Sequence, residues 1–190
     1  MKNTLRYNPP SEWNKDNNYN YQYFGLIRLC EHLVSYFVER KNITMLEIGS
    51  YKGESTSIFA STGLFSKITC LEPFEGNEEA LDLLDDDWIR VKKEFWTNTR
   101  HWNNINLVQK FSYDAIDQFP NKHFDFIYID ANHKYEDIKS DINMYLPKCK
   151  KIIGGHDYGN QHPGVMKAVN EIFTFPDVIF DDGSWIKVIS

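Results

Sequence analysis

The apolar positions of the chain change repeatedly between the spacing of strands and the spacing of helices. Short apolar runs predict strands at 43–48, 66–71, 105–110, 124–129 and 150–153. Helical spacing lies between them, at 21–40, 54–62, 77–84, 88–102, a short stretch ending before Pro120, 131–145 and 165–173. Two last runs, 178–181 and 185–189, flank a turn and predict an antiparallel hairpin. Strands that alternate with helices imply a mostly parallel sheet, so we expect an α/β fold with seven strands.

The first helix is expected to pack on this sheet through apolar residues that recur at helical spacing. These residues are Phe24, Ile27, Cys30, Val34, Phe37 and Val38. Residues 1–20 are rich in Asn, Tyr and Pro and show no periodicity, so they are expected to form an N-terminal arm. Residues 21–190 are expected to form a single domain.

Composition narrows the class of protein. A formal charge of −6 argues against nucleic acid as a partner. No apolar run reaches membrane-spanning length and no leader is expected, so we predict a cytoplasmic protein without membrane contact. Cys30, Cys70 and Cys149 lack metal-type spacing and are expected to be buried free thiols. A homodimer is compatible with this composition.

Polar residues gather where the predicted strands end, and ligands of parallel sheets bind beyond those carboxyl ends. The groups are 47–53, Glu72, 112–114, 130–133 and 156–157. The first is a strand–loop–helix junction that exposes backbone N–H groups, or simply a turn that needs Gly49 and Gly53. A dinucleotide-binding loop would have glycine at positions 51 and 54, where this chain has Tyr51 and Glu54, so the sequence argues against that type of loop.

Glu72, after the second strand, could accept both hydroxyl groups of a ribose or be an exposed carboxylate before proline. Together with the glycine loop, it indicates an adenosine-type cofactor.

The segments MLEIGSYKGES, ITCLEP, FSYDAI, FDFIYIDANHKYEDI and IIGGHDY resemble the class I S-adenosylmethionine-dependent methyltransferases. Within that family the chain is most similar to the small-molecule O-methyltransferases, with a catechol-type cofactor loop and a second half like the macrocin and cephalosporin-cluster group. The resemblance covers roughly residues 43–189. It implies a Rossmann-like three-layer sandwich with a terminal antiparallel hairpin.

The resemblance also implies roles for individual residues. Those assigned to the cofactor are Glu47, Gly49, Ser50, Tyr51, Gly53, Ser55, Glu72, Phe74, Ser112, Tyr113 and Asp130. In this assignment Gly49, Ser50 and Tyr51 pack against the methionine part and Ser55 binds its carboxylate. Glu72 holds the ribose, with Phe74 nearby, while Ser112 and Tyr113 lie against the adenine. Glu47 orients the loop or touches the methionine amine.

A divalent metal, Mg²⁺ or Mn²⁺, is implied at Asp130, His156 and Asp157, where it would activate an acceptor hydroxyl. His156 departs from the acidic residue of the relatives and suits Mn²⁺, Fe²⁺ or Zn²⁺ better, or indicates that no metal binds. Alternatively, 154–157 is a glycine turn in which Asp157 caps a helix. His133 is expected to act as the catalytic base with Asp130 beside it, or merely to pack where Asn132 caps a helix.

The sequence therefore predicts an S-adenosylmethionine-dependent O-methyltransferase for a small hydroxylated acceptor, a sugar or natural product, with divalent-metal assistance. A nicotinamide or nucleotide-sugar oxidoreductase and a non-catalytic cofactor-binding protein are the alternatives. Four aromatic residues are further candidates for the acceptor pocket on aromatic character alone, with a place in the core or at the rim as the simpler alternative for each: Trp102, Tyr158, His162 and Trp185.

Overall fold

The computed structural model describes residues 17–37, 41–75 and 88–189, with side chains from Tyr23 onward. The strands are β1 (Ile43–Ile48), β2 (Phe65–Leu71), β3 (Ile105–Val108), β4 (Phe124–Ile129), β5 (Cys149–Gly155), β6 (Val178–Ile179) and β7 (Trp185–Val188). The helices are α1 (Asn17–Val34), α2 (Glu54–Ser61), α3 (Trp88–Thr99), α4 (Ser112–Ala115), α5 (Tyr135–Tyr145) and α6 (Pro163–Phe173). Short 3₁₀ turns, η2 (Ile116–Gln118) and η3 (Leu146–Lys148), follow α4 and α5.

The strands form one sheet in the order β3-β2-β1-β4-β5-β7-β6. The pairs among β1 to β5 are parallel, whereas β7 runs antiparallel to both β5 and β6. The chain moves outward from β1 to β3 and then returns to β4 on the other side of β1. The direction of winding therefore reverses between β1 and β4, and at such a point the loops after the two strands separate and leave a crevice for ligands.

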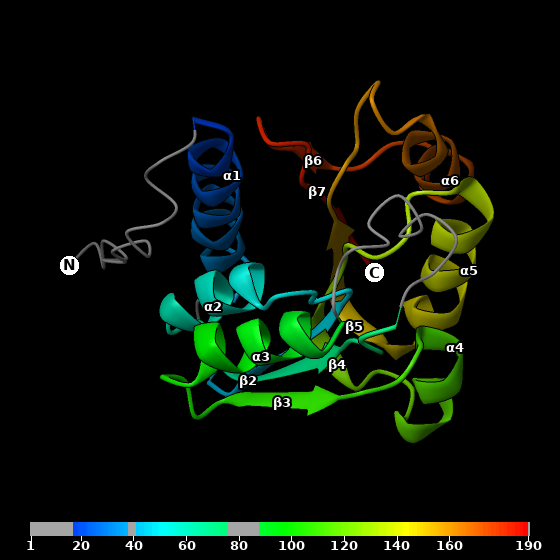
Figure 1. The fold of residues 1–190 in the computed structure, drawn as a ribbon. Coiled ribbons are helices and arrows are strands. Elements are labelled where there is room, and N and C mark those ends of the chain that lie inside the picture. The colour runs from blue at the N-terminus through cyan, green and yellow to red at the C-terminus, as the bar shows by residue number, and fades with distance from the viewer. Residues whose placement is uncertain (1–16, 38–40, 76–87, 190) are drawn as a thin grey trace.

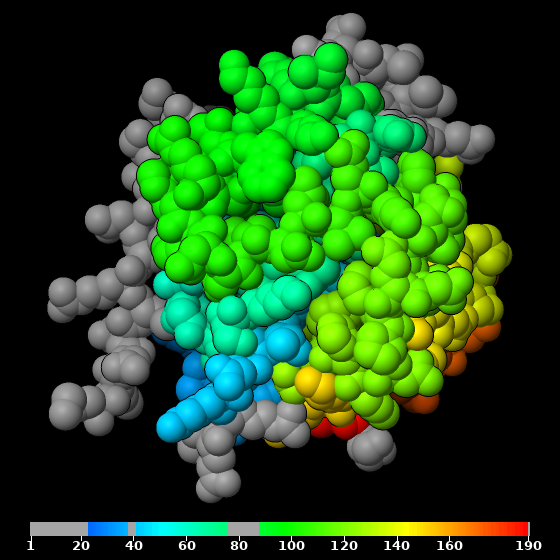
Figure 2. All heavy atoms as spheres, turned by 90° about the horizontal axis from the view of Figure 1, so that it is seen from below, coloured from blue at the N-terminus to red at the C-terminus, as the bar shows by residue number. Residues whose placement is uncertain are grey.

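Two layers of helices cover the sheet. Helices α1, α2 and α3 lie on one side of it and α4, α5 and α6 on the other (Figure 1). Each side has its own buried cluster, and neighbouring residues of β1 alternate between them: Met45 belongs to the first cluster, and Leu46 and Ile48 to the second. Seen from below, residues around α3, β3 and α4 make up most of the surface (Figure 2). The Rossmann-like three-layer sandwich with its terminal hairpin is confirmed.

Helix α1 differs from the prediction in its limits and in its buried face. It begins at Asn17 and ends at Val34, whereas 21–40 was expected. Phe24 is 57% exposed and Val34 46% exposed, so these two residues do not face the core. The residues of α1 that pack in the core are Tyr23, Leu26, Leu29, Cys30 and Leu33. This stripe also has helical spacing, and it contains three leucines, so the apolar pattern alone does not distinguish it from the stripe through Phe24.

Several other predictions can be compared with the described residues. All three cysteines are free thiols and buried. No helix in the described ranges has the length and apolar character needed to cross a membrane. The helix expected at 77–84, and residues 1–16 of the expected arm, lie outside the described residues.

Candidate active site

A cavity of about 1040 Å³ lies at the carboxyl ends of the parallel strands. Its walls come from the loop after β1, the ends of β2 and β4, the start of α4, one side of α5 and the segment between β5 and α6, with further residues from α1, α2 and α3. The volume is at the upper end of the range for ligand pockets, which leaves room for a cofactor and an acceptor together. Predicted site residues that line it are Gly49, Ser50, Tyr51, Ser55, Glu72, Ser112, Tyr113, Asp130, His133, His156 and Asp157.

Glu47 lies behind the loop and does not line the cavity. Its buried carboxylate accepts hydrogen bonds from Ser50 Oγ at 2.9 Å, from Ser55 Oγ at 2.6 Å and from the Thr56 hydroxyl. Burial raises the pKa of Glu47 to about 7, although the three hydroxyl groups oppose this change. Of the two roles expected for Glu47, these hydrogen bonds support the one in which it orients the loop. The hydroxyl proton of Ser55 is used in this contact, so the predicted bond from Ser55 to the cofactor carboxylate requires an exchange of partners.

Gly49 joins the loop to the other half of the cavity. Its φ is +85°, and a Cβ atom there would lie 2.2 Å from the Asp130 carbonyl oxygen. Asp130 N also donates to Ile48 O at 2.8 Å. Because only glycine permits this approach, the loop after β1 lies directly on the backbone after β4.

Glu72 is buried at the end of β2 and accepts two backbone hydrogen bonds. Its carboxylate oxygens take the N–H groups of Tyr51 at 2.8 Å and Phe74 at 2.9 Å. Burial raises its pKa. Two further cofactor predictions, Gly53 and Phe74, fall outside the cavity wall, as Glu47 does: a Cβ atom on Gly53 would lie 2.8 Å from the Phe95 ring, and Phe74 is buried in the core.

The predicted adenine side is formed where α4 and α5 meet. Ser112 and Tyr113 line the cavity there, and Tyr113 is 60% exposed and stacks on Phe111 with ring centroids 5.2 Å apart. The Tyr145 hydroxyl donates to Ser112 O at 2.8 Å and holds the first turn of α4 against α5. Asp141 lies beside them, and burial raises its pKa to about 6.

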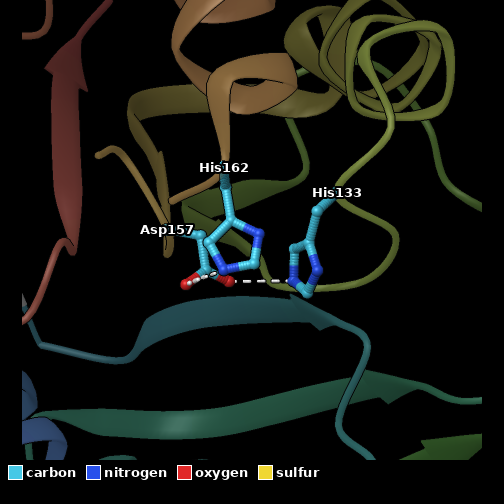
Figure 3. Close-up of side chains that lie close together, drawn as sticks. All are labelled: His133, Asp157 and His162. Atoms are coloured by element: carbon cyan, nitrogen blue, oxygen red, sulfur yellow. Dashed lines mark ion pairs between the residues drawn. The ribbon is translucent and has the colours of Figure 1, made fainter. Parts of the chain in front are cut away.

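Three histidines and two aspartates converge at the opposite end of the cavity, and we call them the His–Asp cluster (residues 130, 133, 156, 157 and 162). His133 Nε2 lies 2.8 Å from Asp157 Oδ2, and His162 Nε2 lies 3.5 Å from Asp157 Oδ1 (Figure 3). His156 Nδ1 lies 3.1 Å from Asp157 Oδ1. Asp130 Oδ1 is 4.0 Å from both His133 Nε2 and His156 Nδ1.

The charges of the His–Asp cluster are strongly coupled. Asp130 and Asp157 raise the pKa of His133 to about 10. Burial lowers the pKa of His156, but the surrounding carboxylates, Asp182 included, outweigh burial and raise it to about 9. The contacts with His133 and His156 outweigh burial at Asp157 and hold its pKa well below the usual range. At neutral pH the protein alone therefore has two imidazolium rings around the Asp157 carboxylate.

The sequence identified four of the five members of the His–Asp cluster as site residues. His162 was expected only as an aromatic candidate for the acceptor pocket, yet its ring lies 4.5 Å from that of His133 and within reach of Asp157. The buried Asp182 of the hairpin turn, 3.8 Å from His156 Nε2, was missed entirely. Of the other aromatic candidates, Trp102 donates to Ser57 Oγ away from the cavity, and Trp185 is buried in the core.

Comparison with known proteins now identifies the family. Residues 46–158 match the family described as "Methyltransferase domain", which is more than half of the 190 residues. The chain belongs to this methyltransferase family. It is an S-adenosylmethionine-dependent methyltransferase, which decides against the oxidoreductase alternative.

Other proteins share the sequence or the fold. An uncharacterized protein of Acanthamoeba polyphaga mimivirus is 28% identical in an alignment of 171 positions that covers 83% of this chain and 71% of that protein. The structure of CalS11, a calicheamicin methyltransferase, superposes with a TM-score of 0.65 at 15% identity, over 97% of this chain and 88% of CalS11. A Staphylococcus aureus protein provisionally assigned as a caffeoyl-CoA O-methyltransferase gives 0.59 at 17% identity, over 94% of this chain and 95% of that chain. At these identities the two structures show a shared fold.

Proposed function

We propose that this methyltransferase transfers the methyl group to a hydroxyl oxygen of a small, neutral acceptor such as a sugar or a natural product. One observation carries the proposal. The backbone of Gly49, in the predicted cofactor loop, lies against the backbone of Asp130, the first residue of the His–Asp cluster. A methyl donor on the loop would therefore lie beside the cluster.

The chemistry needs an oxygen nucleophile aligned with the sulfonium methyl group more than it needs strong acid–base catalysis. During transfer the S–CH₃ bond breaks, an O–CH₃ bond forms, and the acceptor loses its hydroxyl proton. Asp130 and His133 are the proposed catalytic residues, because both line the cavity beside the loop. His133 can take the proton only after losing its own, since the neighbouring carboxylates hold its pKa near 10.

The charges of the wall favour a neutral acceptor. Among the described residues, the acidic side chains that line the cavity are Glu54, Glu72, Glu75, Asp130, Asp137, Asp141 and Asp157, and they outnumber the positive charges of Lys52, Lys110 and the imidazolium rings of His133 and His156. Lys52 already forms an ion pair with Glu94 at 3.2 Å. This wall suits a cationic sulfonium and repels phosphate groups. CalS11 is described as a TDP-rhamnose 3′-O-methyltransferase. We infer that the present acceptor, unlike a nucleotide sugar, has no diphosphate.

The residues present fit a divalent cation, which the resemblance implies. The His–Asp cluster offers imidazole and carboxylate donors in two sets of three residues, and within each set the donor atoms lie within 4.8 Å of one another. Such a mixed set suits Mn²⁺, Fe²⁺ or Zn²⁺ better than Mg²⁺, which prefers oxygen. A bound cation would favour the ionised form of the acceptor hydroxyl. The residues of the cluster would hold the cation, orient the acceptor and receive its proton.

The experiment has two stages. Calorimetric titration with S-adenosylhomocysteine should show binding, and a labelled methyl group from S-adenosylmethionine should then appear on neutral polyhydroxylated acceptors and not on their phosphorylated counterparts. Asp130→Asn should retain S-adenosylhomocysteine binding and lower turnover by roughly a hundredfold. Labelling confined to amine or thiol acceptors, or full activity of Asp130→Asn, would contradict the proposal.

A further inference from the structure

We propose that His133, Asp157 and His162 form a transition-metal site, and that they hold the divalent cation in place of the set Asp130, His156 and Asp157 implied by the resemblance. We call these two sets the outer triad and the inner triad; both include Asp157. The inference deepens the proposed function, on which it rests for its role, because it names the ligands and the class of cation. Its test uses metal binding alone, so the two proposals can fail separately.

The first argument is the spacing of the donor atoms. Metal–ligand bonds of about 2.1 Å place neighbouring donors about 3.0 Å apart at right angles and about 3.4 Å apart in a tetrahedron. In the outer triad, Asp157 Oδ2 is 2.8 Å from His133 Nε2, and Asp157 Oδ1 is 3.5 Å from His162 Nε2. Both distances, one to each carboxylate oxygen, are close to that range. In the inner triad, His156 Nδ1 is 3.1 Å from Asp157 Oδ1 but 4.0 Å from Asp130 Oδ1, so the side chains of His156 and Asp130 would have to approach each other.

The second argument is the packing that brings His162 to His133. A Cβ atom on Gly164 would lie 2.5 Å from the His133 carbonyl oxygen and 2.8 Å from Tyr135 N. The first turn of α6 therefore rests on the backbone that precedes α5, and the ring centroids of His133 and His162 lie 4.5 Å apart with their planes tilted by 57° (Figure 3). His162 makes no side-chain hydrogen bond to cap α6. Its position serves the cavity and not the helix end.

The outer triad is more accessible from the cavity than the inner triad. The side chains of His133 and His162 are 35% and 34% exposed, and both line the cavity. The inner His156 side chain is 14% exposed, and its Nε2 points toward the buried Asp182. A cation on the outer triad can therefore take acceptor oxygens from the cavity as further ligands. Asp130 is then left outside the ligand set, so that Asp130, and not the metal-bound His133, would accept the proton of the hydroxyl group.

The donor chemistry selects the class of cation. Two imidazoles and one carboxylate, with the remaining positions open, are typical of sites for Fe²⁺, and they also suit Mn²⁺, Co²⁺ and Zn²⁺. Mg²⁺ prefers oxygen ligands and keeps most of its waters, so it should compete poorly. The site would thus distinguish this protein from relatives whose metal is held by carboxylates.

Co²⁺ is the probe of choice, because imidazole coordination changes its visible absorption. The full chain, freed of metal by chelation, would be titrated with Co²⁺ in the absence of S-adenosylmethionine and acceptor. We expect stoichiometric binding that a hundredfold excess of Mg²⁺ leaves in place. His162→Ala should weaken Co²⁺ binding roughly a hundredfold or more, while Asp130→Asn, the matched inner-triad variant, should change it less than about threefold.

The two variants separate the possible results. Asp157→Asn should lose the metal whichever triad holds it, and thermal melts without metal would show that each variant is folded. Strong loss in Asp130→Asn with binding kept in His162→Ala would move the cation to the inner triad and overturn the inference. Equal losses in both variants would overturn the assigned set, and so would the absence of Co²⁺, Mn²⁺ and Zn²⁺ binding to the unmodified protein. Loss of methyl transfer with unchanged Co²⁺ binding would count against the proposed function alone.

Discussion

Glu47→Gln should change the free energy of unfolding in a pH-dependent way. Relative to the unmodified protein, the variant should gain stability as the pH rises from acidic to neutral. The buried carboxylate has a pKa of about 7, compared with an ordinary value of 4.5. The folded state therefore holds a proton that the unfolded state has already released between these pH values. As pH rises through this window, the unfolded state gains a stabilising ionisation that the folded state lacks, so stability falls.

The magnitude follows from the size of the shift. A difference of about 2.5 pH units corresponds to about 3 kcal/mol at 1.36 kcal/mol per unit. The free energy of unfolding of the unmodified protein, minus that of Glu47→Gln, should fall by about this amount from pH 4.5 to pH 7.5. Below pH 4.5 Glu47 is protonated in both states and contributes nothing to the slope.

Urea unfolding followed by tryptophan fluorescence, without cofactor, measures this difference directly. Glu136→Gln removes a carboxylate from an exposed position in α5 and serves as the matched control for the loss of one carboxylate. A constant difference between the unmodified protein and Glu47→Gln across the window would refute the reasoning. It would mean that the hydroxyl groups of Ser50, Ser55 and Thr56 fully offset the cost of burial.

Two further predictions concern the loop contact and the cysteines. Gly49→Ala should lower both the free energy of unfolding and the affinity for S-adenosylhomocysteine, because the new Cβ would overlap the Asp130 carbonyl. Gly63→Ala is the control: Gly63 has φ +67° but lies in open space, so this substitution should cost only about 1 kcal/mol. Equal effects of the two substitutions in urea melts would contradict the contact. The three cysteines should resist an aromatic disulfide reagent in the native protein and react after unfolding. The reason is that Cys30, Cys70 and Cys149 are all buried, and burial raises the pKa of each thiol. Rapid colour formation without denaturant would show that one of them is accessible.

The sheet could be predicted from sequence because its signals are local. The run at 124–129 is apolar at nearly every position, and all six residues of β4 are buried. The buried face of α1 could not be predicted in the same way, because that helix has more than one apolar stripe. Phe24 and Leu26 both fit helical spacing, and only the packing against α2 and the sheet decides that Leu26 is buried.

In the candidate site, too, some residues could be predicted from sequence and others depend on packing. Asp130, His133, His156 and Asp157 follow the ends of neighbouring strands, so the topology alone brings them together. His162 precedes a helix, and its position depends on how α6 packs against the segment before α5. That approach is set by Gly164, a contact between residues far apart in sequence that no periodicity reports. The sequence shows that a histidine stands at position 162, but it does not show that His133 and Asp157 are its neighbours.

The two backbone bonds of Glu72 define how much binding capacity this carboxylate has left. An ionised carboxylate can accept about four hydrogen bonds, and the N–H groups of Tyr51 and Phe74 take two of them. The remaining capacity equals the two hydroxyl groups of a ribose, which is the contact predicted for Glu72. One side chain thus fixes the loop and keeps room for the ligand, so the cofactor would meet a surface that is already in its binding shape. Glutamine has a single acceptor oxygen and could not serve both partners.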